Sequence, residues 1–471
     1  MAAFGWKVVY DGKTPPPGEV VKPDERLSWP RTVGLGAQHV IAMFGATFVF
    51  PIVMGLNPNV AIMMSGVATI MFLLIVQGKV PSYLGTSASF VGAVVAIRAA
   101  GGDDATVTGA ILVAGAVLAV VGLAIHFLGR EFIHKVFPPV VTGAVIMIIG
   151  FNLAFVVADF YWLVDQWVAL ATMAFVLLAS VVLPGFWGRI SILLGLVFGY
   201  LLSWLLDATA GPITSANPLN NFTVEPHLRL NLAPIVEAPW FGLPQFHGPS
   251  FSTAAILLTL PAVIALIAEN TGHVKAVGAM TKTDVDPVIG RAIFADGVGT
   301  VVASSVGGSP TTTYAENIGV MAATRIYSTA AYYVAAVVAI LFGLCPKFGA
   351  LVAATSNGVL GGITVVLYGM IGLLGAKIWI EARVDFGNPV NLMPIGAGLI
   401  LAIGPVTHFI TGDFSIGGIA FGTIVVLVGY HTLHALAPAY LKDTERPVGA
   451  GESTGGAERA SRRPDRRRNR R

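Results

Sequence analysis

The chain has 471 residues, of which 55% are hydrophobic and 11% charged, and its mean hydropathy is +0.77. This composition excludes an ordinary soluble protein and indicates a polytopic membrane protein, because so large an apolar fraction needs lipid as well as a protein interior to cover it. The single cysteine, Cys345, excludes an intrachain disulfide, and the net charge of +3 indicates no nucleic-acid partner, because ten of the 28 Lys and Arg residues lie together beyond Leu441.

The polar, proline-rich segment 1–32 is expected to be a cytoplasmic N-terminal segment, since it has no apolar core and so is not a signal peptide. Beyond it, about 20 apolar residues are needed to cross ~30 Å of hydrocarbon. Runs near this length predict fourteen membrane segments, seven in a first repeat (33–206) and seven in a second (251–436). The segments are 33–53, 59–77, 81–97, 108–127, 138–157, 167–183, 190–206, 253–272, 288–306, 311–324, 329–344, 358–379, 389–406 and 415–433.

The stretches between and after the repeats are polar. Residues 207–250 form the one sizeable loop, which is expected on the extracytoplasmic side. Residues 437–471 are basic and are expected to be a disordered cytoplasmic tail that follows the positive-inside rule and is weakly attracted to anionic lipid. With both termini in the cytoplasm, the outer loops hold three basic residues, Arg98, Arg229 and Lys347, which supports this orientation.

Two of the fourteen segments are too polar and too irregular to be ordinary spans. The third carries the small, polar run 84–89. In the tenth, Pro310 and three threonines favour extended backbone before a half-helix that is expected to begin near Ala315 or Glu316. Irregular backbone is tolerated at bilayer depth only where protein or a water-filled cavity surrounds it. The two broken segments are therefore predicted to form a substrate site.

The two halves of the chain resemble each other. Residues 139–150 align with 358–369, so that their glycines coincide at an offset of 219. Because seven segments is an odd number, the second half inserts upside down relative to the first. This predicts an inverted repeat whose broken segments meet near the bilayer midplane. The alternative is a chance likeness between Gly-rich apolar segments.

Ionisable residues at bilayer depth are the candidates for chemistry. Glu316 lies at the expected start of the half-helix, where an acid is either a cap or a functional group. Glu269 and His273 lie four residues apart on one helical face and can exchange a proton. The alternative is a structural hydrogen-bonded pair near the cytoplasmic interface. Asp296, in a Gly-rich stretch, is a weaker candidate that is expected to bond to neighbouring backbone.

Two carboxylates and a set of helix-start amides suit a small flat molecule with alternating N–H and C=O groups. Uracil has this pattern, although composition alone does not select it from other polar solutes. The sequence contains no Walker motif, metal-ligand cluster or catalytic constellation. The chain is therefore not expected to be an enzyme or to need a cofactor or a metal.

Several motifs resemble those of the nucleobase–ascorbate transporter (nucleobase:cation symporter-2) family. They are Gln38-His39 in the first segment, Ser82-Tyr83-Leu84-Gly85 in the third, Glu269-Asn270-Thr271-Gly272-His273 in the eighth, and Glu316-Asn317-Ile318-Gly319 followed by Thr324-Arg325 in the tenth. The similarity runs from Val33 to Leu436. It is greatest to bacterial uracil permeases and to the pyrimidine permeases of the pyrimidine-utilisation (Rut) pathway.

The resemblance implies an all-α polytopic membrane protein with a core and a gate domain, proton symport, and a homodimer in the inner membrane of a bacterial cell. It implies that Glu269 and Glu316 bind the base, that backbone near Ala315 contacts its carbonyl, and that His273 tunes or relays the proton. The expected substrate-binding set is Glu269, Glu316, Ala315, Tyr314 as a brace, Ala46, Ser87, Ala88 and Phe90. The supporting motif residues are Gln38, His39, Asn317, Gly319, Thr324 and Arg325.

Two departures from the family bear on the substrate. Ala88 stands where some uracil permeases have a phenylalanine that stacks on the base, and Ala315 stands where they have a glycine. Phe90, on the same face of an extended segment as Ala88, is expected to supply the missing ring. A roomier pocket would admit thymine or a purine.

The sequence therefore predicts a proton-coupled importer of uracil, with thymine and related pyrimidines as further substrates, that works by alternating access. One alternative is a xanthine or urate permease, which a glutamine in place of Glu316 would favour. Another is an anion exchanger or channel on the same architecture, which two central acids disfavour.

Overall fold

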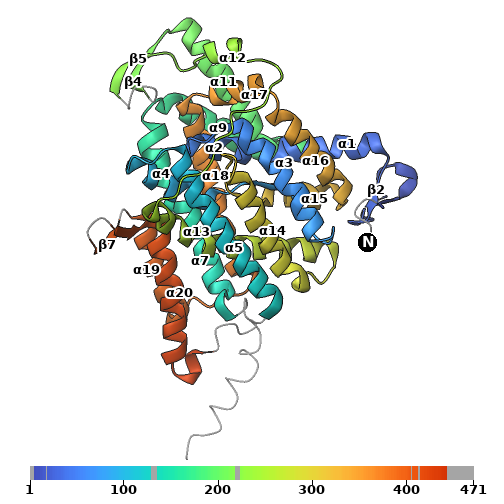
Figure 1. The fold of residues 1–471 in the computed structure, drawn as a ribbon, viewed down its shortest axis with the longest axis vertical. Coiled ribbons are helices and arrows are strands. Elements are labelled where there is room, and N and C mark those ends of the chain that lie inside the picture. Colours follow the sequence, from blue (N-terminus) through green and yellow to red (C-terminus); the bar gives the residue numbers. More distant parts are fainter. Residues whose placement is uncertain are drawn as a thin grey trace, which may run out of the picture.

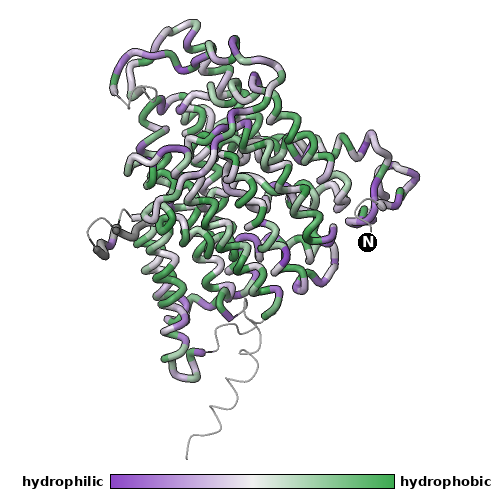
Figure 2. The backbone as a smooth tube through the Cα atoms, viewed as in Figure 1, coloured by the Kyte–Doolittle hydropathy of each residue, from purple (hydrophilic) through white to green (hydrophobic). Residues whose placement is uncertain are grey.

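The computed structural model describes residues 5–16, 18–128, 135–217, 223–404, 406–411 and 414–442. The expected tail beyond residue 442 lies outside this part of the chain. Within it, the named strands form four two-stranded pairs and the other regular elements are helices (Figure 1). Hydrophobic residues predominate along the helices, while hydrophilic residues are frequent in the N-terminal segment (Figure 2).

The elements of the first half begin with a short parallel pair in the N-terminal segment, β1 (Lys7–Val8) and β2 (Glu25–Arg26). They continue with α1 (Trp29–Ala42), α2 (Phe44–Val53), α3 (Pro58–Ile75), β3 (Leu84–Thr86), the 3₁₀ turn η2 (Ala88–Phe90), α4 (Val91–Ala99), α5 (Asp104–Leu128), α7 (Pro139–Asn152), α8 (Ala154–Val156), the π-helical turn Val157–Trp162, α9 (Gln166–Val182), α10 (Phe186–Arg189) and α11 (Ser191–Thr209).

The second half follows a hairpin, β4 (Ile213–Asn217) and β5 (Thr223–His227), and the short α12 (Ala233–Glu237). It consists of α13 (Thr253–Thr281), α14 (Asp286–Ser304), β6 (Thr311–Thr313), α15 (Ala315–Thr324), α16 (Thr329–Gly343), α17 (Pro346–Ala353), α18 (Asn357–Glu381), α19 (Pro389–Ile403), β7 (Thr407–Thr411), β8 (Phe414–Gly417) and α20 (Gly418–Leu436).

Short polar residues and prolines determine where several helices begin. Asn57 caps α3 by accepting hydrogen bonds from two first-turn amides, and Pro58 follows at the position where a missing N–H costs nothing. Asp165, Ser356 and Asn388 cap α9, α18 and α19 in the same way. These caps fix the residues at which the helices begin.

The described residues contain nine helices that are long and apolar enough to cross a membrane. The pair α16 and α17, bent by 83°, is a tenth if it is taken as one span. The four remaining predicted segments contain the shorter apolar helices Ala88–Ala99, Gln166–Val182 and Pro389–Ile403, and α15. Each predicted segment thus contains a helix, and the count of fourteen crossings stays a prediction.

The helices pack in two groups. The core group is α1, α3, α5, α13, α14, α15, α16 and α17, and the gate group is α7, α9, α11, α18, α19 and α20. Matching contacts recur in the two halves: α3 packs on α16 as α14 packs on α5, α1 on α16 as α13 on α5, and α9 on α11 as α19 on α20. An inverted repeat produces this correspondence, and it confirms the predicted fold class.

Glycines allow the closest helix pairs to form. A Cβ atom added to Gly122 of α5 would lie 2.3 Å from the backbone nitrogen of Phe294 in α14. In the gate group, a Cβ on Gly150 of α7 would lie 2.2 Å from the backbone nitrogen of Gly372 in α18. Small residues let membrane helices approach backbone to backbone, which is why glycine is so frequent in this chain.

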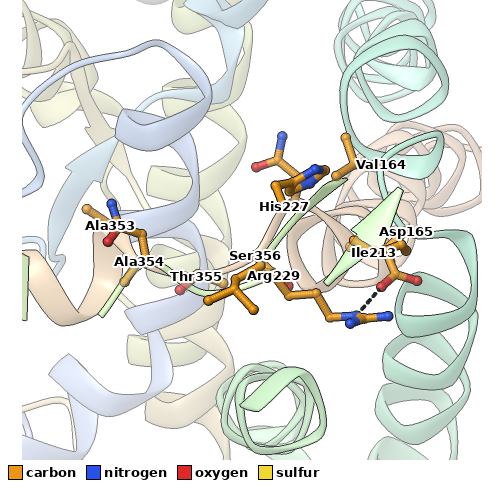
Figure 3. A pocket seen from close by; sticks show the side chains of 13 residues that line it. Val164, Asp165, Ile213, His227, Arg229, Ala353, Ala354, Thr355 and Ser356 are labelled. Carbon is orange, nitrogen blue, oxygen red and sulfur yellow. Dashed lines mark hydrogen bonds and ion pairs between the residues drawn. The ribbon is translucent and has the colours of Figure 1, made fainter. Parts of the chain in front are cut away.

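The loop 207–250 is held to the gate group by a buried ion pair. Arg229, just beyond β5, donates from Nε to Asp165 Oδ2 (2.7 Å; Figure 3) and from Nη1 to Asp207 Oδ1 (3.1 Å). None of the three side chains is more than 12% exposed. A cavity of about 110 Å³ lies beside this cluster, lined also by His227 and by Ser356 in the link from α17 to α18 (Figure 3).

The same loop is held to the core group at α17. Lys347 Nζ donates to the carbonyl oxygen of Ile235 (2.8 Å) and lies 5.4 Å from the centre of the Trp240 ring. Backbone hydrogen bonds join Lys347 to Pro239 and Gly242 to Leu344. The loop therefore bridges the two helix groups.

Candidate functional site

The two broken segments meet, as the sequence predicts. Strands β3 and β6 pair antiparallel, with Leu84 opposite Thr313 and Thr86 opposite Thr311. The pairing continues beyond the strands through Ser87 N to the Pro310 carbonyl (2.9 Å). Two segments more than 220 residues apart in sequence thus form one buried strand pair inside the core group.

Threonines on the neighbouring helices complete the hydrogen bonding of this strand pair. Thr69 Oγ1 of α3 accepts from Leu84 N (2.9 Å), and Thr300 Oγ1 of α14 accepts from Thr311 N (3.0 Å). The two helices are counterparts in the inverted repeat, so each half supplies the same support. Water does not reach a buried strand edge. These hydroxyl groups therefore satisfy backbone N–H groups that the break in the helices would otherwise leave without a partner.

A helix begins directly after each strand. Helix α15 starts at Ala315, which confirms the predicted start of the half-helix. On the other side, Ser87 caps η2 by accepting from Ser89 N (3.3 Å), and η2 leads into α4. The first amides of such helices lack partners within the helix and carry the positive end of its dipole. The centre of the core group therefore offers hydrogen-bond donors.

The two acids supply the acceptors. Glu269 on α13 accepts from Ser89 Oγ (3.2 Å), and Glu316 lies in the first turn of α15. Helix α13 packs against η2, β6 and α15, so the two acids lie on neighbouring elements. Both acids are half-buried, whereas their neighbours Asn270 and Asn317 are fully buried.

Open space lies one helical turn beyond each acid. A Cβ atom added to Gly272, three residues after Glu269, would meet nothing within 4 Å, and the same holds for Gly319, three residues after Glu316. Residues three apart lie on the same side of a helix. Each acid therefore has open space beside it on its own helix, and the two helices pack against each other.

His273 and Glu269 are bonded to different partners. His273 Nδ1 lies 3.0 Å from Thr313 Oγ1 in β6, while Glu269 bonds to Ser89. The alternative of a structural Glu269–His273 hydrogen bond is not found, because Ser89 of η2 bonds to Glu269 and Thr313 of β6 bonds to His273. The histidine is thereby tied to the second broken segment and the glutamate to the first.

Asn317 and His39 form a buried support behind α15. Asn317 Nδ2 lies 3.1 Å from His39 Nδ1 and donates to the His39 carbonyl (3.2 Å). The His39 ring packs at 4.4 Å against the ring of Tyr332, whose hydroxyl group contacts Met321 Sδ of α15 at 3.7 Å. These contacts fix the rotation of α15 and hence the direction of Glu316.

Tyr314 lies across the strand pair. Its hydroxyl group donates to the Thr86 carbonyl (2.8 Å), and its ring lies so close to Gly85 that a Cβ atom there would be 2.4 Å from the ring. The side chain is 4% exposed. This geometry fits the bracing role that the family resemblance implies.

Replacing Gly85 by Ala is expected to displace the Tyr314 ring and the start of α15. Overpacking a close contact costs about 1–3 kcal/mol, and a cost of this size in the substrate-binding conformation lowers apparent affinity about 5- to 150-fold. Transport kinetics at matched expression measure this loss. The control is Gly396→Ala on α19, where an added Cβ meets nothing within 4 Å. Transport by Gly85→Ala equal to that of the control would contradict the bracing role.

The expectation for Phe90 rests on a wrong local structure. The extended stretch ends at Ser87, and residues 88–90 form a 3₁₀ turn, so Ala88 and Phe90 do not alternate as on a strand. Phe90 is fully buried in the core and Ala88 is 7% exposed. The turn forms because Ser87 caps it. The small, polar residues of this segment are compatible with either a strand or a turn, so the sequence does not predict which one forms.

The remaining predicted residues lie on α1, α2 and α15, and two of them are at the end of α15 away from the strand pair. Ala46 is in α2, Gln38 is half-buried on α1, and Thr324 and Arg325 end α15, with Arg325 exposed and in a left-handed conformation (φ +58°). Sequence reasoning does not identify Ser89 as a hydrogen-bond partner of Glu269, although Ser89 lies in the broken segment. The sequence predicts that Asp296 bonds to neighbouring backbone. Its carboxylate instead accepts from the Asn270 side chain (3.1 Å).

Comparison with known proteins identifies the family of this chain. The model of a permease family, Xan_ur_permease, matches residues 30–411. The chain belongs to this family, the nucleobase:cation symporter-2 permeases. This permease is 41% identical over 457 residues to the "Putative pyrimidine permease RutG" of Escherichia coli K12, covering 95% of this chain and 98% of that one. It is 33% identical to the uracil permease of Bacillus subtilis 168, covering 85% and 92%.

Solved structures share the fold of this permease at low sequence identity. The transmembrane domain of the cyanobacterial bicarbonate transporter BicA superposes with a TM-score of 0.57 and 14% identity, over 85% of this chain and 96% of that one. Murine Slc26a9, an anion transporter in the inward-facing state, superposes with a TM-score of 0.62 and 11% identity, over 87% and 69%. These likenesses establish the inverted-repeat fold alone.

Proposed function

We propose that this permease imports uracil, with thymine and related pyrimidines as further substrates, together with a proton. The observation that carries the proposal is the pair of half-buried acids, Glu269 and Glu316, on two helices that pack together beside the broken segments, each with open space one turn further along its helix. The names of the relatives, which include uracil and pyrimidine permeases, support the same substrate class.

The chemistry of the space matches an imide ring. The carboxylate oxygens of Glu269 and Glu316 accept hydrogen bonds from the two N–H groups of the base, and the amides at the start of α15, near Ala315, donate to a carbonyl oxygen. Ser87 and Ala88 lie at the matching helix start on the other broken segment. With alanine at 88, the site has room beside the ring for the methyl group of thymine.

The same acids offer a route for coupling. A carboxyl group away from bulk water is kept ionised only by a partner, so binding of a base that donates to Glu269 changes how readily that acid holds a proton. His273 is tied to β6 through Thr313, so its hydrogen bonding responds to the broken segment that the base contacts. The bound proton and base then cross together as the gate group moves against the core group.

The setting of the transporter follows from the same proposal. The permease lies in the cytoplasmic membrane of a bacterial cell with both termini inside, so that the loop 207–250 faces outward. It works as a homodimer. The purine reading, a xanthine or urate permease, has less support, since Glu316 is an acid and the relatives reported above carry pyrimidine names.

Uptake of labelled uracil by cells that lack their own uracil permease tests the proposal. Uptake is expected to be lost with a protonophore, and to be competed by unlabelled thymine but not by xanthine or urate. Uptake that a protonophore leaves unchanged would contradict proton coupling. Competition by xanthine alone would move the substrate to the purines.

A further inference from the structure

A second cavity lies beneath the N-terminal segment, and none of its lining residues belongs to the strand pair. Its volume is about 450 Å³, and it is bounded by the N-terminal segment, the end of α3 and the start of α16. The residues that matter for its chemistry are Trp6, Lys7, Asp24, Leu73, Leu74 and Tyr333. None of them belongs to the proposed nucleobase site.

The N-terminal segment that roofs this cavity is folded onto the helices. Val21 bridges to Ile326, and Tyr327 N donates to the Val21 carbonyl (2.8 Å). The Trp6 indole nitrogen also donates to Thr329 Oγ1 (2.8 Å). The Thr329 amide donates to the Pro23 carbonyl (3.1 Å). The cavity is therefore a built feature of the fold.

The walls of the cavity are of the kind found at a membrane surface. Leu73 and Leu74 form an apolar side, and Leu74 is 44% exposed, toward the outside of the helix bundle. Trp6 packs edge-on against Trp29 (6.1 Å between ring centres) and Tyr333 (5.7 Å). Tryptophan and tyrosine rings gather where lipid headgroups meet the hydrocarbon. The cavity thus has the mixed polar and apolar walls that suit the part of a phospholipid where the headgroup joins the acyl chains.

The polar side of the cavity carries one charge of each sign. Lys7 and Asp24 lie on adjoining chain segments, since Lys7 N donates to the Asp24 carbonyl (3.0 Å). Within the described residues, neither side chain takes part in an ion pair. Two unpaired opposite charges beside an apolar wall complement a ligand that is zwitterionic at one end and apolar at the other.

We propose that this cavity binds a phospholipid with a phosphoethanolamine headgroup. Lys7 pairs with the phosphate, the primary ammonium group donates to the Asp24 carboxylate, and an acyl chain leaves along Leu74. A choline headgroup fits less well, because its three N-methyl groups leave no N–H donor for Asp24. The bound lipid would hold the N-terminal segment against the residues that follow α15.

Native mass spectrometry of the full-length permease, purified from an equal mixture of phosphatidylethanolamine and phosphatidylcholine, tests this site. The wild type is expected to retain several-fold more phosphatidylethanolamine. Asp24→Asn should bring the ratio close to one, and Lys7→Gln should lower retention of both lipids. Matched changes outside the cavity, Asp11→Asn and Lys13→Gln, should leave both readouts unchanged.

Two further arms keep the test decisive. Leu74→Trp, which fills the apolar side, should reduce lipid retention, and soluble glycerophosphoethanolamine should not compete, because it has no acyl chain. Equal retention of the two lipids by the wild type would overturn the proposal. So would an unchanged ratio in Asp24→Asn, or competition by the soluble headgroup. The uracil uptake assay reads the nucleobase site separately.

Discussion

Glu269→Gln is expected to abolish accumulation of uracil. Glutamine keeps the size of the side chain and an oxygen that accepts from Ser89, but it neither carries a charge nor exchanges a proton. Loss of a charged hydrogen bond costs about 1.5–3 kcal/mol, which lowers affinity about ten- to a hundredfold. Uptake of labelled uracil at matched expression measures the effect. The control is Glu381→Gln, an exposed acid at the end of α18.

Exchange measurements separate binding from coupling in the same variant. Labelled uracil exchanged against internal unlabelled uracil, without a pH gradient, reports whether the base still crosses. Loss of accumulation with some exchange remaining assigns Glu269 to coupling as well as to binding. Wild-type accumulation by Glu269→Gln, still sensitive to a protonophore, would contradict both roles.

Arg229→Met is expected to give the largest loss of stability. It would leave the carboxylates of Asp165 and Asp207 without their shared cation, although they are only 4% and 12% exposed. Removing one partner of a buried ion pair costs about 3–5 kcal/mol. Heating the detergent-solubilised protein and measuring the folded fraction by size-exclusion chromatography should show a clearly lower unfolding temperature.

Two companion variants identify the cause. Lys377→Met breaks an ion pair with Glu381 whose members are 68% and 67% exposed, and should change stability by about 1 kcal/mol or less. Adding Asp165→Asn and Asp207→Asn to Arg229→Met removes the unpaired charges, and asparagine still caps α9. This combination should recover most of the loss. An unchanged unfolding temperature in Arg229→Met alone would show that the ion pair does not hold the loop.

The local chemistry of the second broken segment was enough to predict its structure. Pro310 and the following threonines disfavour helix, and α15 begins at Ala315 as expected. The first broken segment was harder, because its small residues permit either strand or turn. There the cap of Ser87 decides for a 3₁₀ turn, and the argument for Phe90 fails with it.

Contacts between distant segments were beyond sequence reasoning. Spacing on one helix puts Glu269 and His273 on the same face, but only the fold shows that Glu269 bonds to Ser89 and His273 to Thr313. The support of the strand pair by Thr69 and Thr300 likewise depends on how the two halves interlock. The sequence predicts that the loop 207–250 is polar and extramembrane. It gives no sign that Arg229 forms ion pairs with Asp165 and Asp207.

The position of a bound base tests the central claim most directly. A structure of the permease with 5-bromouracil, located by the anomalous scattering of bromine, should place the ring between Glu269 of α13 and the start of α15 at Ala315. Bromine found instead in the cavity beside Arg229, with the space between the two acids unoccupied, would contradict the account.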